Sequence, residues 1–221
     1  MKPLNLYSIC SAPVALVATG VLAALAAALP GAASMLQFDR AAILGHAQWW
    51  RLFTGHFCHW DINHLIWDVA VFAVAGMLVA RESKARFAAC VFVTAGVSSA
   101  LLLAARPELD VYRGLSGIDC ALVMATAVTL FLRADSSVGQ KAGALTLMLA
   151  GIAKVAFETL LDDTLFVRNA NFLLVPSAHI VGLVIGGIAA LVHAIPQRNH
   201  ERLNPTFPVR GIKRRFLTIF D

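Results

Sequence analysis

Long apolar runs alternate with short polar segments along most of the chain. Six runs approach the length of about 20 residues that a helix needs to cross a bilayer core. They cover roughly residues 12–29, 62–80, 87–105, 115–132, 142–161 and 172–195. The runs are solidly apolar, whereas strands of a membrane barrel alternate in polarity. The pattern predicts an all-α polytopic membrane protein, with six transmembrane helices in a single domain over residues 1–221.

The composition supports this class. Hydrophobic residues make up 59% of the chain and charged residues 14%, against about 25% charged in soluble domains. The first run follows Lys2 and precedes GAAS, as a signal peptide would. It is longer than the usual apolar core of about 7–15 residues in such a peptide. We therefore expect a membrane span there.

The distribution of basic residues predicts the orientation. Six spans put both termini on the same side of the membrane. If that side is the cytoplasm, the cytoplasmic segments hold 12 of the 18 Lys and Arg residues, and the outer segments hold five. Such a bias follows the positive-inside rule. The segment 197–221 is then a short basic cytoplasmic tail that either serves only as this signal or also touches anionic lipid.

Few cofactors or partners are indicated beyond the lipid bilayer. The four cysteines are Cys10, Cys58, Cys90 and Cys120, and their spacing makes neither a disulfide framework nor a zinc site. We expect no metal and no cofactor. Basic residues are not interleaved with stacking aromatics, so we expect no nucleic acid. The oligomeric state is left open.

Polar residues inside membrane spans are costly and therefore candidates for function. In the predicted topology the even-numbered spans run inward from the outer face. His64, Ser116 and His179 each lie within the first residues of one of these spans. The topology alone therefore places three chemically active side chains at one depth, near the outer surface.

A serine and a histidine at one depth indicate nucleophilic catalysis. Histidine takes the serine proton near neutral pH, provided that the two approach to about 2.6–3.2 Å. Small residues at four-residue spacing let helices approach this closely. One such stripe contains Gly117, and the other contains Gly182 and Gly186. We expect these stripes to bring Ser116 and His179 together.

The segment around Ser116 has the features of an oxyanion site. Gly114 and Gly117 free the chain for a tight turn. Backbone N–H groups at a helix start are unpaired and stabilise a developing negative charge. His64 would add a side-chain donor to this site.

At these residues the sequence resembles the rhomboid family of intramembrane serine proteases. The resemblance covers almost the whole chain, and its motifs are GLSG at 114–117, AHIVGLVIG at 178–186, WWRLFT at 49–54 and HWDINH at 59–64. It implies a Ser116–His179 dyad, with His64 in the oxyanion-hole role.

Two positions depart from the family pattern. Family members usually have Asn four residues after that His, where this chain has Asp68. An ionised carboxylate cannot donate a hydrogen bond, so Asp68 is either protonated or orients His64. Many bacterial members have Tyr four residues after the Ser, where this chain has Cys120.

The compact form, with TGHF and GLSGID, most resembles the rhombosortase branch. That resemblance implies membrane-anchored protein substrates, cut at C-terminal Gly-Gly-type sorting tails of exported proteins. It also implies a bacterial inner membrane location, with the active site opening to the periplasmic side.

Other polar residues receive simpler interpretations. Asp119 either tunes the site or pairs with a polar neighbour. Lys154 and Glu158 are four residues apart and are expected to form an ordinary intrahelical ion pair. A separate group of histidines is expected to lie at the membrane interface: His46, His56 and His59.

Three other functions compete with the protease. A catalytically inactive rhomboid-like protein that binds transmembrane clients would be expected to lack Ser116 or His179. A transporter with a proton relay would spread polar residues over the full depth. An aspartyl protease using Asp68 and Asp119 would need Gly-x-Gly-Asp, and the sequence at 117–119 is GID.

Overall fold

The computed structural model describes the backbone of residues 6–161 and 175–203, and the side chains of residues 12–161 and 175–192. The tail expected at 197–221 lies outside these residues beyond position 203. The longer helices are α1 (Leu6–Ala27), α5 (Ile62–Glu82), α7 (Thr94–Ala105), α8 (Ser116–Leu132), α9 (Val138–Leu161) and α10 (Pro176–Leu203). A short helix, α6 (Lys84–Ala88), continues through the π-helical segment η2 (Ala89–Val93) into α7.

Three helical stretches among the described residues are long and apolar enough to cross a membrane: Ile62–Glu82, Lys84–Ala105 and Val138–Leu161. Shorter apolar helical stretches coincide with the other predicted runs, at Ala12–Ala27, Ser116–Leu132 and Pro176–Val192. The helical class and these three candidate spans are confirmed. The count of six spans stays a prediction.

Local capping sets both ends of α5. The Asp61 carboxylate accepts a hydrogen bond from the His64 backbone N–H at 2.8 Å and so begins α5. Ser83 ends α5, and its side chain accepts from the Arg86 N–H at 3.2 Å, which begins α6. One residue therefore closes one helix and opens the next, which reverses the chain sharply.

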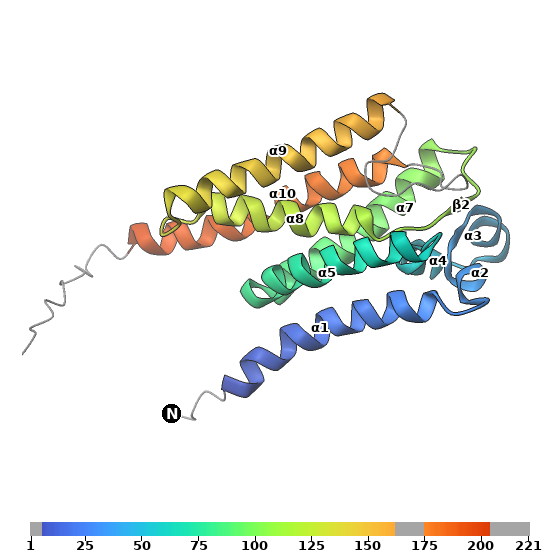
Figure 1. The fold of residues 1–221 in the computed structure, drawn as a ribbon, viewed down its shortest axis with the longest axis horizontal. Helices are drawn as coiled ribbons and strands as arrows, with labels where there is room; N and C mark the ends of the chain where they lie inside the picture. The colour runs from blue at the N-terminus through green and yellow to red at the C-terminus, as the bar shows by residue number, and fades with distance from the viewer. Residues whose placement is uncertain (1–5, 162–174, 204–221) are drawn as a thin grey trace, which may run out of the picture.

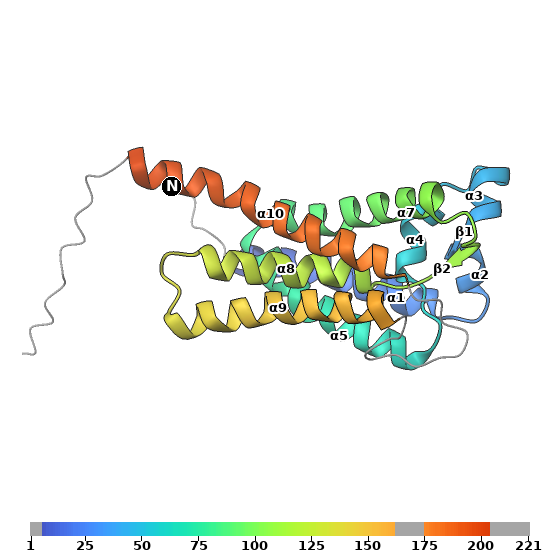
Figure 2. The ribbon, with the colours of Figure 1, turned by 90° about the horizontal axis from the view of Figure 1, so that it is seen from above.

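Helix α8 is the centre of the bundle. It packs against α5, α9 and α10, while α1 lies outside α5 (Figures 1 and 2). Its apolar side chains Ile118 and Leu122, and that of Leu115 just before it, are fully buried in the main core cluster. The first residues of α1 and the last of α10 lie at the same end of the bundle, opposite the strands (Figure 1).

The other end of the bundle is closed by short elements between α1 and α5. These are α2 (Ala32–Leu36), β1 (Phe38–Asp39), α3 (Arg40–His46), α4 (Arg51–Thr54) and the 3-10 helix η1 (Gly55–Phe57). Strand β1 pairs antiparallel with β2 (Val111–Tyr112), so that Phe38 faces Tyr112 in register. This small sheet is a departure from the all-α prediction, and it ties the first connection to the segment before Ser116.

A partly buried arginine, Arg40, supports this closed end. The Arg40 guanidinium donates to the backbone carbonyls of Leu102 at 2.6 Å and Leu103 at 3.0 Å, and also to that of Arg106 at 2.7 Å. These are carbonyls at the end of α7, where a helix leaves its last acceptors unpaired. Arg40 therefore fixes the end of α7 against the first connection.

The histidines of this region correct the sequence prediction. His46 is exposed, but His56 and His59 are buried rather than interfacial. The His56 Nε2–H donates to the Ala95 carbonyl at 3.2 Å and lies 3.1 Å from the Ser99 hydroxyl. Burial lowers the pKa of His56 from 6.5 to about 4. Hydrogen-bond partners on a neighbouring helix thus bring this ring into the core.

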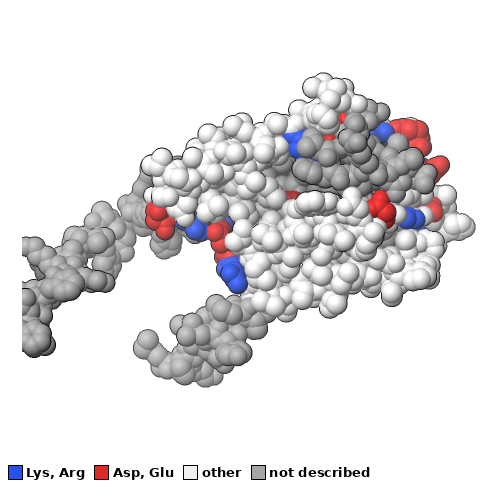
Figure 3. Space-filling model, viewed as in Figure 1, with Lys and Arg blue, Asp and Glu red and all other residues white. Residues whose placement is uncertain are grey.

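The surface matches a membrane environment. Large apolar side chains are exposed along α5, α9 and α10, including Ile66, Val74, Leu149, Ile152 and Ile188. Figure 3 shows most of the charged residues of one face near the two ends of the molecule, with few between them. A soluble monomer rarely exposes so much contiguous apolar surface, so these helix faces fit contact with lipid.

Candidate active site

Ser116 is the first residue of α8, at the closed end of the bundle. Gly114, two residues before it, has φ of +143°, which side chains rarely tolerate. A Cβ at Gly114 would also lie 3.3 Å from the His64 ring. A glycine is therefore required here for the backbone to turn tightly past His64 into the serine.

His179 lies in the first turn of α10, which begins with Pro176. Proline suits the first helical position, because its missing N–H would have no helical partner there. The His179 Nε2 is 2.7 Å from the Ser116 Oγ, and His179 is buried. The structure thus brings the predicted serine and histidine within hydrogen-bond distance.

Glycines allow this approach. A Cβ on Gly182 would overlap the carbonyl oxygen of Gly117, and one on Gly186 would overlap that of Ala121. In the other direction, a Cβ on Gly117 would lie 3.0 Å from the Ala178 carbonyl oxygen. The backbones of α8 and α10 are therefore in direct contact, as the small-residue stripes predicted.

Asp68, on α5, faces a cluster of donors. Its Oδ2 accepts from the Leu115 backbone N–H at 3.0 Å, and it lies 3.1 Å from the His64 Nε2 and 3.3 Å from the His59 Nε2. An oxygen surrounded by donors acts as an acceptor. The geometry therefore favours the alternative in which Asp68 orients His64, and it adds His59, which the sequence interpretation placed at the interface.

The Leu115 contact changes one expectation about the helix start. The backbone N–H groups beside Ser116 were expected to point toward a ligand, yet that of Leu115 donates to Asp68. The donation instead anchors the residue before Ser116 to α5. Asp68 therefore holds both the nucleophile segment and the His64 ring.

Glu158 is the residue that sequence reasoning missed. The expected ion pair is present, with the Lys154 Nζ 2.6 Å from the Glu158 Oε1. The other oxygen, Oε2, lies 2.8 Å from the His179 Nδ1. The pair is therefore not an ordinary intrahelical one. A signal existed, because Glu158 is near the end of its predicted span, at the depth that the predicted topology gives to His179.

A comparison with protein families matches the rhomboid domain over residues 46–195. This range is more than half of the 221 residues. The chain belongs to the rhomboid family. Members of this family are typically intramembrane serine proteases, which act on membrane protein substrates within the bilayer. No curated protein matches the chain.

The matched range of this rhomboid protein runs from the end of α3 into α10. It includes Ser116, His179, Asp68 and Glu158. Together with the apolar helices, the rhomboid domain indicates an integral membrane protein of the intramembrane protease type.

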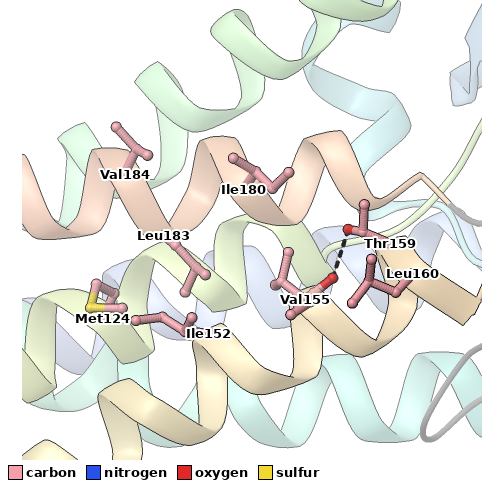
Figure 4. Close-up of a pocket in the computed structure, with 9 residues that line it drawn as sticks. Met124, Ile152, Val155, Thr159, Leu160, Ile180, Leu183 and Val184 are labelled. Carbon is pink, nitrogen blue, oxygen red and sulfur yellow. Dashed lines mark hydrogen bonds between the residues drawn. The ribbon is translucent and has the colours of Figure 1, made fainter.

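Two further features surround the rhomboid site. Asp119 is buried within α8, and its Oδ1 has no hydrogen-bond partner among the described residues. Beside the site, a cavity of about 590 Å³ opens between α9 and α10 (Figure 4). Its walls are apolar, from side chains such as Val155, Ile180 and Leu183. The described part of the chain holds no group of three His, Cys, Asp or Glu side chains suited to a metal ion.

Proposed function

We propose that this rhomboid protein is an intramembrane serine endopeptidase that uses a dyad of Ser116 and His179. The observation that carries the proposal is the 2.7 Å separation of the Ser116 Oγ and the His179 Nε2. A serine hydroxyl attacks a peptide carbonyl only when a base removes its proton, and this distance permits that transfer.

The reaction follows from these two atoms. The Ser116 Oγ bonds to the substrate carbonyl carbon while its proton passes to the His179 Nε2. His179 then gives this proton to the leaving amine, the peptide bond breaks, and an acyl ester on Ser116 remains. Water, deprotonated by His179, cleaves the ester and regenerates the serine.

The oxyanion formed in each step needs donors near Ser116. The proposed donors are backbone N–H groups in the first turn of α8, which begins at Ser116. His64, packed against Gly114 and held by Asp68, is assigned a supporting role. A hydrogen-bond donor at this buried site stabilises the negative charge of the transition state more than it would in water.

The proposed topology has six spans with both termini in the cytoplasm. Its support is the basic-residue bias, together with the start of α1 and the end of α10 lying at one end of the bundle. Ser116 then opens toward the periplasmic side of a bacterial inner membrane. The proposed substrates are exported proteins anchored by C-terminal Gly-Gly-type tails, supported by the resemblance of GLSGID and TGHF to the rhombosortase branch.

The test is co-expression with exported proteins that carry such C-terminal tails, followed by mass spectrometry of the released ends. We expect one defined cut near the tail, lost in Ser116→Ala. Ser98→Ala is the matched control, because it removes a serine hydroxyl on α7 rather than the one on α8. Cleavage by Ser116→Ala at the wild-type rate would overturn the assignment. Cleavage of other membrane substrates alone would retain the protease and remove the sorting-tail substrate.

A further inference from the structure

The side chain of Glu158 occupies a place that the Ser–His dyad does not explain. It comes from α9 and reaches the Nδ1 of His179 on α10, on the far side of the ring from Ser116. We propose that Glu158 is a positioning residue that makes the pair a Ser116–His179–Glu158 triad. Lys154 controls the orientation of the Glu158 side chain toward His179. The proposal rests on the proposed protease function.

The tautomer that His179 needs is the first support for a role of Glu158. To take the serine proton, the His179 Nε2 must be unprotonated, so the neutral ring must carry its hydrogen on Nδ1. A carboxylate accepts and never donates. The Glu158 Oε2 at 2.8 Å therefore selects the reactive tautomer and also stabilises the imidazolium that forms after proton transfer.

The burial of Glu158 is the second support. Glu158 is 3% exposed, and a carboxylate removed from water needs compensating partners. Each of its oxygens has one, with Lys154 at Oε1 and His179 at Oε2. The Lys154 side chain is 24% exposed, so its end of the network is nearer to the surface. The ammonium thus offsets the buried charge and leaves Oε2 directed at the ring.

A plain helix-stabilising pair would look different. Exposed ion pairs four residues apart contribute little, and nothing in them requires one oxygen to contact a second helix. Here the carboxylate is more deeply buried than the ammonium and bridges α9 to the first turn of α10. The arrangement is the one by which a third group orients a catalytic base.

Lys154 determines which orientation the amide is expected to take in Glu158→Gln. An ammonium only donates, so it holds the amide oxygen of the glutamine on its own side. The amide NH₂ then faces the His179 Nδ1 and donates to it, which places the ring hydrogen on Nε2. That tautomer cannot accept the serine proton. Removing Lys154 as well allows the amide to turn its oxygen toward Nδ1 and restores the reactive tautomer.

The experiment measures kcat and KM for wild type, Glu158→Gln, Glu158→Asp, Lys154→Met and the double variant Lys154→Met/Glu158→Gln. Prolonged labelling with a fluorophosphonate counts the folded sites, so each kcat is expressed per titrated serine. Glu82→Gln is the matched control, because Glu82 also forms ion pairs but with Arg86 and Arg133 away from the site.

We expect Glu158→Gln to lower kcat per titrated site by about 100-fold or more with KM little changed. Glu158→Asp keeps the charge and should retain more rate than the glutamine. The double variant should regain about tenfold over Glu158→Gln alone, an interaction of the kind that a double-mutant cycle detects. Glu82→Gln should match wild type.

The outcomes separate the two proposals. A Glu158→Gln enzyme within about threefold of wild type per titrated site would overturn the triad and leave the dyad standing. A double variant no faster than Glu158→Gln would overturn the control by Lys154. Absence of labelling and of cleavage in the wild type, under conditions that keep it folded, would overturn the protease function instead.

Discussion

The α-carbon of Gly182 faces the backbone carbonyl of Gly117 so closely that a single added Cβ would overlap the carbonyl oxygen. In this contact Gly117 directly follows Ser116, and Gly182 is about one helical turn after His179. It sets the separation of α8 and α10 at the candidate site, and the geometry of the dyad depends on it.

Gly182→Leu and Gly186→Leu should therefore lower activity by on the order of 100-fold without changing a catalytic atom. A leucine forces the two helices apart, and a displacement of about 1 Å is enough for such a loss. Cleavage rates in membranes or detergent measure the effect. Gly143→Leu is the control, because a Cβ at Gly143 meets no atom within 4 Å. Near-normal rates in both test variants would show that the close contact is dispensable.

Ser116→Ala and His179→Ala should each abolish cleavage while the protein still folds and inserts. The two residues act as a unit, so the double variant should be no slower than either single variant. A fluorophosphonate should label wild type and fail to label Ser116→Ala. If the single losses instead add up in the double variant, the two side chains work independently and the dyad is wrong.

Asp68→Asn should lower activity by about tenfold or more at every pH. An amide is a poorer acceptor than a carboxylate for the His64 ring and the Leu115 N–H, and hydrogen bonds to charged groups contribute about 1.5–3 kcal/mol. Rate profiles of the two proteins against pH make the measurement. An asparagine variant that keeps full activity and escapes a loss seen in wild type at high pH would favour a protonated, donating Asp68.

His56 predicts a pH dependence of stability. Burial lowers the pKa of His56 in the folded protein to about 4 from 6.5. Between these values the unfolded chain binds the extra proton, so unfolding becomes easier as pH falls from about 6.5 to 4 and changes no further below that window. The contribution is about 3 kcal/mol for a fully buried group, since one pKa unit corresponds to about 1.4 kcal/mol.

Thermal unfolding in detergent at pH 7 and pH 5 measures this term. Wild type should lose stability over that interval by more than His56→Gln, which has no ring to protonate. His46→Gln is the matched control, because His46 is exposed. Equal losses in wild type and His56→Gln would place the titrating group elsewhere.

The sequence determined the helical class because the signal is local. Each apolar run needs only its own residues to form a helix in an apolar medium, and every such run in the described part of the chain is helical. Ser116, His64 and His179 could be placed at one depth for the same reason, since depth along a span is read by counting from its end. The glycines of the packing stripes were equally readable, because their spacing is a property of one helix.

Only the tertiary structure decided which side chains meet across helices. The partner of Glu158 depends on how α9 is rotated and shifted against α10, and the sequence showed only the nearer Lys154. The burial of His56 depends on hydrogen-bond acceptors that α7 presents to the connection between α1 and α5. The pairing of Phe38 with Tyr112 joins segments that are far apart in the chain. Depth is set within one helix by its contact with the bilayer, but rotation and partner choice are set by packing between helices. The sequence therefore located the serine and the histidine, and the fold supplied the carboxylate behind them.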